Sequence, residues 1–142
     1  MLKKLDLKLL ALGFLPLLTG VAVYQVRSNI LLFLMDFPFL LLWGWLSYRV
    51  ADTDRTPLPQ ALALSAVSLL FLTAIAGWEV FLGWSVFSNH HCLLPFVFVP
   101  SLIAYVLGVN ATRPIFVLAV CTIIGGSQFL AAFAGCRLRS IV

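Results

Sequence analysis

The feature that most constrains this chain is a series of five apolar runs, each about long enough to cross a lipid bilayer as a helix. A hydrocarbon core about 30 Å thick requires roughly 20 apolar residues of helix. The runs are separated by charged or turn-forming residues, and they cover residues 9–26, 30–48, 60–80, 93–109 and 114–135. The sequence therefore predicts an all-α, polytopic integral membrane helical bundle with five transmembrane helices, forming one domain over residues 1–142.

Composition agrees with a lipid environment. Hydrophobic residues make up 63% of the chain and charged residues only 10%, whereas about a quarter of the residues in a typical soluble domain are charged. This balance excludes a disordered chain, a disulfide-stapled secreted miniprotein and a protein with the dense basic patch of a nucleic-acid binder. We expect the lipid bilayer as a partner and no nucleic acid.

The number of crossings depends on the third run. Only three residues separate the first two runs, and residues 110–113 join the last two, so each pair is predicted to form a tight antiparallel hairpin. The third run keeps its apolar character, with interruptions, from Gln60 to Phe87, which is longer than one crossing. Four crossings therefore remain an alternative to five.

Basic residues predict the orientation, because Lys and Arg accumulate on the cytoplasmic side of membrane proteins. With the N-terminus inside, five crossings place six basic residues in the cytoplasm and three outside. The inner set is Lys3, Lys4, Lys8, Arg49, Arg55 and Arg113, and the outer set is Arg27, Arg137 and Arg139. We expect a cell-membrane protein with a cytoplasmic N-terminus and an external C-terminus, although an even number of crossings would return the C-terminus to the cytoplasm.

The first run has a second interpretation. A basic start, a short apolar core and the small residues Gly20 and Ala22 also fit a cleaved secretory signal. Pro16 within the run and the immediate return of apolar sequence at Ile30 favour a retained helix.

Four polar residues in or beside the apolar runs are candidate binding residues. Asp36 is the most informative, because an Asp at a helix centre costs roughly 2.5 to 3.5 kcal/mol on insertion scales. Thr19 lies at equal depth across the first hairpin, Gln128 lies in the outer third of the last run, and Glu79 lies just above that level. These residues fit a cavity for a cation, a proton or a small polar solute. They also fit a set of interhelical hydrogen bonds together with a buried ion pair to Arg27, Arg137 or Arg139, and this packing interpretation is favoured.

Cysteine and histidine residues give weaker signals. His90, His91 and Cys92 are adjacent, but they lack the spaced second pair of a zinc site, and we expect neither a metal nor a cofactor. With five crossings Cys92 and Cys136 both reach the outer face, where a disulfide between them is a candidate.

The last run also carries Ser127, Ala131 and Gly135 at four-residue spacing, a small-residue stripe typical of a helix contact, with an internal helix or a second chain as the partner. Common catalytic motifs are absent from the sequence, so we do not expect an enzyme. The leading functional hypothesis is a small membrane protein that acts through helix contacts as an accessory, assembly or immunity-type subunit, with a membrane protein or a second copy as partner. The alternative is a small transporter or channel component in which Asp36 is the ion- or proton-coupled group.

Overall fold

The computed structural model describes residues 2–24, 29–82, 106 and 113–142, and within these ranges the secondary structure is entirely helical. The elements are α1 (Leu2–Leu12), α2 (Leu15–Tyr24), α3 (Asn29–Val50), α4 (Pro57–Leu82) and α7 (Arg113–Ile141). The all-α prediction is confirmed for this part of the chain. The predicted run 93–109 lies almost wholly outside the described residues, so five crossings are not shown.

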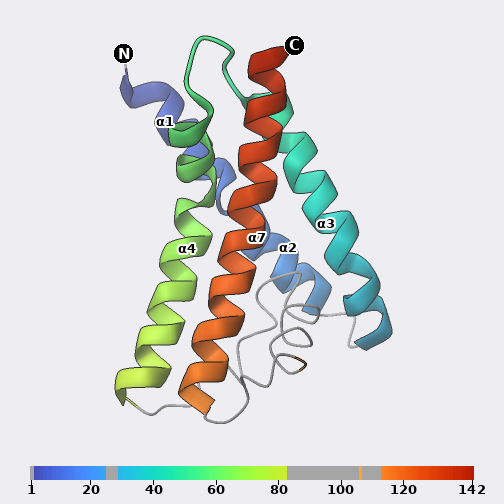
Figure 1. Ribbon diagram of the computed structural model, residues 1–142, viewed down its shortest axis with the longest axis vertical. Coiled ribbons are helices and arrows are strands. Elements are labelled where there is room, and N and C mark those ends of the chain that lie inside the picture. Colours follow the sequence, from blue (N-terminus) through green and yellow to red (C-terminus); the bar gives the residue numbers. More distant parts are fainter. Residues whose placement is uncertain (1, 25–28, 83–105, 107–112) are drawn as a thin grey trace.

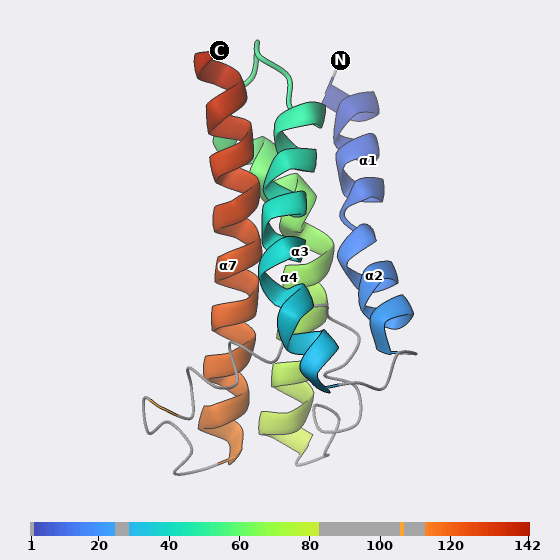
Figure 2. The same cartoon turned by 90° about the vertical axis from the view of Figure 1, so that its right-hand side faces the viewer.

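The described helices pass back and forth along one long axis (Figures 1 and 2). From the N-terminus, α1 and α2 run to the opposite end of the bundle, α3 returns, α4 runs away again and α7 returns. Both chain ends consequently lie at the same end, which we call the terminal end (Figure 1). Five crossings would separate the two ends, so the expected position of the C-terminus opposite the N-terminus differs from this arrangement. The difference lies in α7, which runs from Arg113 back to the terminal end instead of away from it.

Among the residues that the structure describes, two helices, α4 and α7, are long and apolar enough to cross a membrane. In the most apolar 18-residue window of each, only 39% of the residues are buried, so much of their apolar surface faces outward. Large exposed apolar side chains occur on both helices and on α3; they include Leu41, Leu42, Leu70, Phe81, Ile115 and Leu130.

Helix α7 packs against both α3 and α4, and α1 packs against α4 (Figure 2). The centre of the bundle contains the fully buried side chains of Leu64, Val120 and Ile124. The first apolar run is not one continuous helix, because Pro16 has no backbone N–H to donate to the Leu12 carbonyl. The chain instead turns between α1 and α2, where the helical bonding ladder gives way to a tighter bond from Phe14 N–H to the Ala11 carbonyl, 3.2 Å.

One buried side chain holds the turn between α3 and α4 at the terminal end. The Gln60 Oε1 atom accepts a hydrogen bond from Asp52 N–H at 2.7 Å. Its Nε2 atom donates to the Asp52 carbonyl at 3.0 Å and the Arg55 carbonyl at 3.2 Å. Since loop backbone groups need partners when they leave water, this amide fixes where α4 begins relative to α3.

Candidate functional site

Four buried side chains in the middle of the bundle carry polar atoms that have no hydrogen-bond partner within the part of the chain that the structure describes. They are Trp43 of α3, Ser65 and Ser68 of α4 and Gln128 of α7, each at most 3% exposed. The unpartnered atoms are the indole Nε1, both hydroxyl oxygens and both amide atoms of Gln128. An unsatisfied buried polar group costs about 1 to 3 kcal/mol, so this set is an unusual feature of the core. We call it the mid-bundle polar layer.

Helix register places three members of this layer at similar depth. A Cβ atom added at Gly125 would lie 2.8 Å from Leu69 Cδ2 and 3.4 Å from Leu72 Cδ1, and α4 and α7 are antiparallel (Figure 1). Three residues further along α7, Gln128 therefore lies opposite residues 66–69 of α4. This is the level of Ser68, with Ser65 less than one turn away.

The fourth member comes from α3, which runs parallel to α7 (Figure 2). Gly44 packs against Ala131 and Gly135, so Gln128 is approximately level with Phe39. Trp43 lies one turn closer to the terminal end, and its ring stacks on that of Phe39 with a centroid separation of 6.3 Å.

The chemistry of the layer is that of neutral hydrogen bonding. The hydroxyl and amide groups can both donate and accept, and the indole N–H can only donate. None of the four side chains carries a formal charge near neutral pH. The layer is therefore suited to water or to another small uncharged polar group.

The three predicted binding residues whose side chains the structure describes, Gln128, Thr19 and Glu79, do not form one cluster. Gln128 belongs to the polar layer. Thr19 is partly buried and donates its hydroxyl to the Leu15 carbonyl of its own helix at 2.6 Å. Glu79 is buried, at 4% exposure, but it lies eleven residues along α4 from Ser68, about 16 Å at the helical rise. Asp36 belongs to α3, and its side chain lies outside the described residues.

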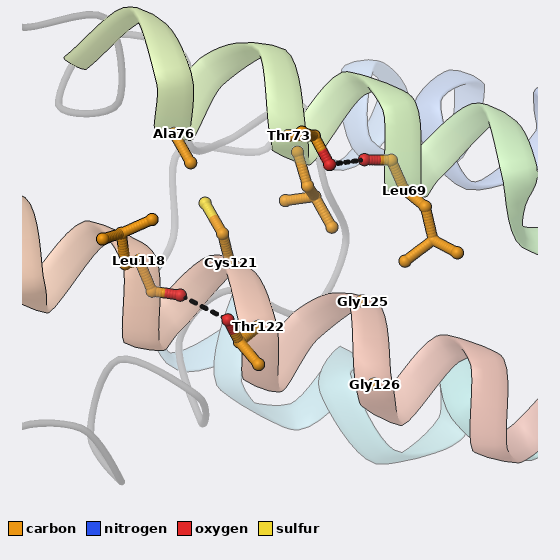
Figure 3. A pocket seen from close by; sticks show the side chains of 9 residues that line it. Leu69, Thr73, Ala76, Leu118, Cys121, Thr122, Gly125 and Gly126 are labelled. Carbon is orange, nitrogen blue, oxygen red and sulfur yellow. Dashed lines mark hydrogen bonds between the residues drawn. The ribbon is translucent and has the colours of Figure 1, made fainter. Parts of the chain in front are cut away.

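A groove lies along the α4–α7 contact, farther from the terminal end than the polar layer. Figure 3 shows the side chains from both helices that line it. Its volume is about 370 Å³. Two threonines line it, and their hydroxyls donate to carbonyls of their own helices, from Thr73 to Leu69 and from Thr122 to Leu118, each at 2.7 Å. Gly126 also lines the groove, and a Cβ atom there would meet nothing within 4 Å. We call it the α4–α7 groove.

The predicted small-residue stripe faces α3 at two of its three positions. A Cβ atom at Gly135 would collide with the Gly44 carbonyl oxygen and would lie 2.9 Å from the Tyr48 nitrogen. Ala131 presents its carbonyl oxygen 3.2 Å from the Cβ position of Gly44. Ser127, the third residue, is partly buried and donates its hydroxyl to the Ile123 carbonyl at 2.7 Å. In this chain, then, Ala131 and Gly135 contact an internal helix.

The described cysteines, Cys121 and Cys136, are both buried free thiols. Cys92, His90 and His91 lie outside the described residues, so the predicted pairing of Cys92 with Cys136 stays a prediction. Within the described ranges, no group of three or more His, Cys, Asp or Glu side chains is placed to hold a metal ion.

Basic residues gather at the terminal end. The sequence predicts five of them on one side of the membrane but places Arg137 and Arg139 on the other. Seven of the nine Lys and Arg residues belong to chain segments at this end, namely Lys3, Lys4, Lys8, Arg49, Arg55, Arg137 and Arg139. Arg113 begins α7 at the opposite end (Figure 1), and Arg27 lies outside the described residues. The direction of α7 accounts for the difference. Five crossings would place Arg113 at the same end as the N-terminus, whereas in the structure Arg137 and Arg139 belong to that end.

Comparison of the chain with protein-family models, with curated protein sequences and with solved structures found no match.

Proposed function

We propose that this chain is an integral protein of the cell membrane whose terminal end faces the cytoplasm. The outward apolar surfaces of α3, α4 and α7 suit lipid better than water. The seven basic residues assigned to the terminal end match the cytoplasmic excess of Lys and Arg in membrane proteins. This proposal retains the cytoplasmic N-terminus expected from the sequence and adds a cytoplasmic C-terminus.

Within the membrane, we propose a non-enzymatic role through helix contacts, as an accessory, assembly or immunity-type subunit. The observation that carries this proposal is the α4–α7 groove. Gly126, one of its lining residues, leaves open space beside α7, and small residues let the backbone of another membrane helix approach closely. The partner is a helix of another membrane protein or of a second copy.

A pair of glycine substitutions tests the role of the groove. Gly126→Leu fills the groove, whereas Gly77→Leu, on α4, adds the same side chain at another glycine whose Cβ position has nothing within 4 Å. We expect Gly126→Leu to reduce the high-mass complex on native gels of membranes about tenfold, equivalent to roughly 1 to 2 kcal/mol of helix contact. Gly77→Leu should leave the complex unchanged. Equal behaviour of the two variants would contradict the proposal.

The mid-bundle polar layer supports a second candidate, a small transporter or channel component. Unpartnered hydroxyl and amide groups inside a membrane bundle are typical of a path for a polar solute or a proton. In this proposal Asp36 of α3 is the ion- or proton-coupled group, as the sequence predicts, and Gln128 binds the solute.

Flux measurements in liposomes test this second candidate. Asp36→Asn should abolish pH- or ion-dependent uptake, and Gln128→Leu should reduce uptake at every pH because it removes both hydrogen-bonding atoms from the layer. Gln128→Leu should also stabilise the fold by about 1 to 3 kcal/mol, since it removes an unsatisfied amide. Unchanged flux in both variants, with normal insertion, would reject transport.

A further inference from the structure

A second groove, which we call the α3–α7 groove, lies on the outer side of the contact between those helices. Its volume is about 560 Å³, and its lining includes Leu41, Gly44, Trp45, Ala134, Gly135 and Leu138. The two glycines let the helix backbones touch at its floor. Leu41, Trp45 and Leu138 are 75%, 59% and 57% exposed. The groove is therefore lined mainly by apolar side chains and is open on the outer surface of the bundle.

Two arginines lie at the end of this groove that is nearer the terminal end. The guanidinium carbon of Arg49 lies 5.8 Å from the ring centroid of Trp45, and that of Arg139 lies 5.5 Å from the ring centroid of Tyr48. Both rings also line the groove. The Nε atom of Arg139 is buried and makes no hydrogen bond within the described part of the chain. Each guanidinium group thus lies against an aromatic ring that lines the groove, and it has N–H groups that can donate further hydrogen bonds.

We propose that the α3–α7 groove binds one anionic phospholipid, with an acyl chain along the groove and the phosphate at Arg49 and Arg139. This inference rests on the membrane location proposed above. Charge complementarity carries it, because guanidinium groups pair with phosphate through several N–H donors, while the groove offers apolar surface to a hydrocarbon chain. The proposed cytoplasmic position of the terminal end also fits, since the cytoplasmic leaflet carries anionic lipids.

Quenching of tryptophan fluorescence by brominated lipids tests this proposal, because Trp45 lies in the groove. The full chain is reconstituted in phosphatidylcholine vesicles that contain either brominated phosphatidylglycerol or brominated phosphatidylcholine. We expect the site to bind the anionic lipid about 25-fold more tightly than phosphatidylcholine, because each of the two arginines raises the affinity about fivefold. A Trp45→Phe variant identifies the share of the signal that comes from the groove.

Three variants separate the headgroup site from the groove. Arg49→Gln combined with Arg139→Gln should reduce the preference to about one, whereas Arg137→Gln, at an exposed neighbouring position, should retain most of it. Ala134→Phe, which narrows the groove without changing charge, should lower quenching of Trp45 by both lipids. Equal quenching by the two lipids in the unmodified protein, or an equal loss in Arg137→Gln, would overturn the proposal.

Two further measurements separate the lipid proposal from a site for a free anion and from the proposed membrane location. An excess of inorganic phosphate, with ionic strength matched by chloride, should not displace the brominated anionic lipid; displacement would reassign the arginines to a free anion and overturn the lipid proposal. Flotation of the vesicles tests the membrane location separately. A protein that floats with vesicles but shows no lipid preference refutes only the lipid site, and a protein that stays in solution refutes the membrane location as well.

Discussion

Gly135→Val is expected to separate α3 from α7 and to lower the free energy of unfolding by at least about 3 kcal/mol, the upper part of the usual range for overpacking. The cost is large because the added atoms would meet backbone, the Gly44 carbonyl oxygen and the Tyr48 nitrogen, instead of the end of a flexible side chain. Reversible unfolding in mixed micelles, followed by circular dichroism, measures the change.

Gly126→Val is the matched control on the same helix. It introduces the same β-branched side chain, but its Cβ atom has nothing within 4 Å. Its effect should therefore be limited to the small difference in helix propensity, below about 1 kcal/mol. If both variants lost stability equally, the loss would not depend on the contact with Gly44 and Tyr48, and close packing of α3 on α7 would be wrong.

Reporter fusions should place both chain ends in the cytoplasm, whereas five crossings would place them on opposite sides of the membrane. The return of α7 to the terminal end and the seven basic residues assigned to that end both lead to this expectation. Green fluorescent protein fused at the C-terminus should fluoresce, and alkaline phosphatase at the same position should be inactive.

The same fusions placed after Leu82 provide an internal control, because α4 ends away from the terminal end (Figure 1). The phosphatase should be active there. An active phosphatase at the C-terminus together with an active one after Leu82 would contradict the shared location of the two ends.

Much of the helical pattern was predictable from the sequence. The predicted runs 30–48 and 60–80 correspond to α3, Asn29–Val50, and α4, Pro57–Leu82. Helix α7 begins at Arg113, one residue before the predicted start at 114, and continues to Ile141, beyond the predicted end at 135. The predicted end follows from hydrophobicity, which marks only where the helix leaves an apolar environment. The backbone hydrogen bonds of the helix continue beyond that point, through Arg137 and Arg139.

The polar layer was predictable only in part. Gln128 is conspicuous because a carboxamide is rare in an apolar run. Ser65 and Ser68 are not, because a helical hydroxyl commonly bonds to a carbonyl of its own helix, as Thr73 does to Leu69. Whether a given serine makes that bond depends on its rotamer and its neighbours on other helices, which a linear pattern does not contain. The same holds for the indole of Trp43.

The contact between Gly44 and Gly135 also sets an order of events during synthesis. The two glycines are 91 positions apart, so at translation speeds of about 5 to 20 residues per second α3 waits roughly 5 to 20 seconds before its permanent neighbour exists. With the membrane location proposed above, the glycine face of α3 contacts lipid or the insertion machinery during that interval. Among the described helices, α7 follows α3 and α4 in the chain and packs against both, so their mutual packing is complete only after α7 has been made.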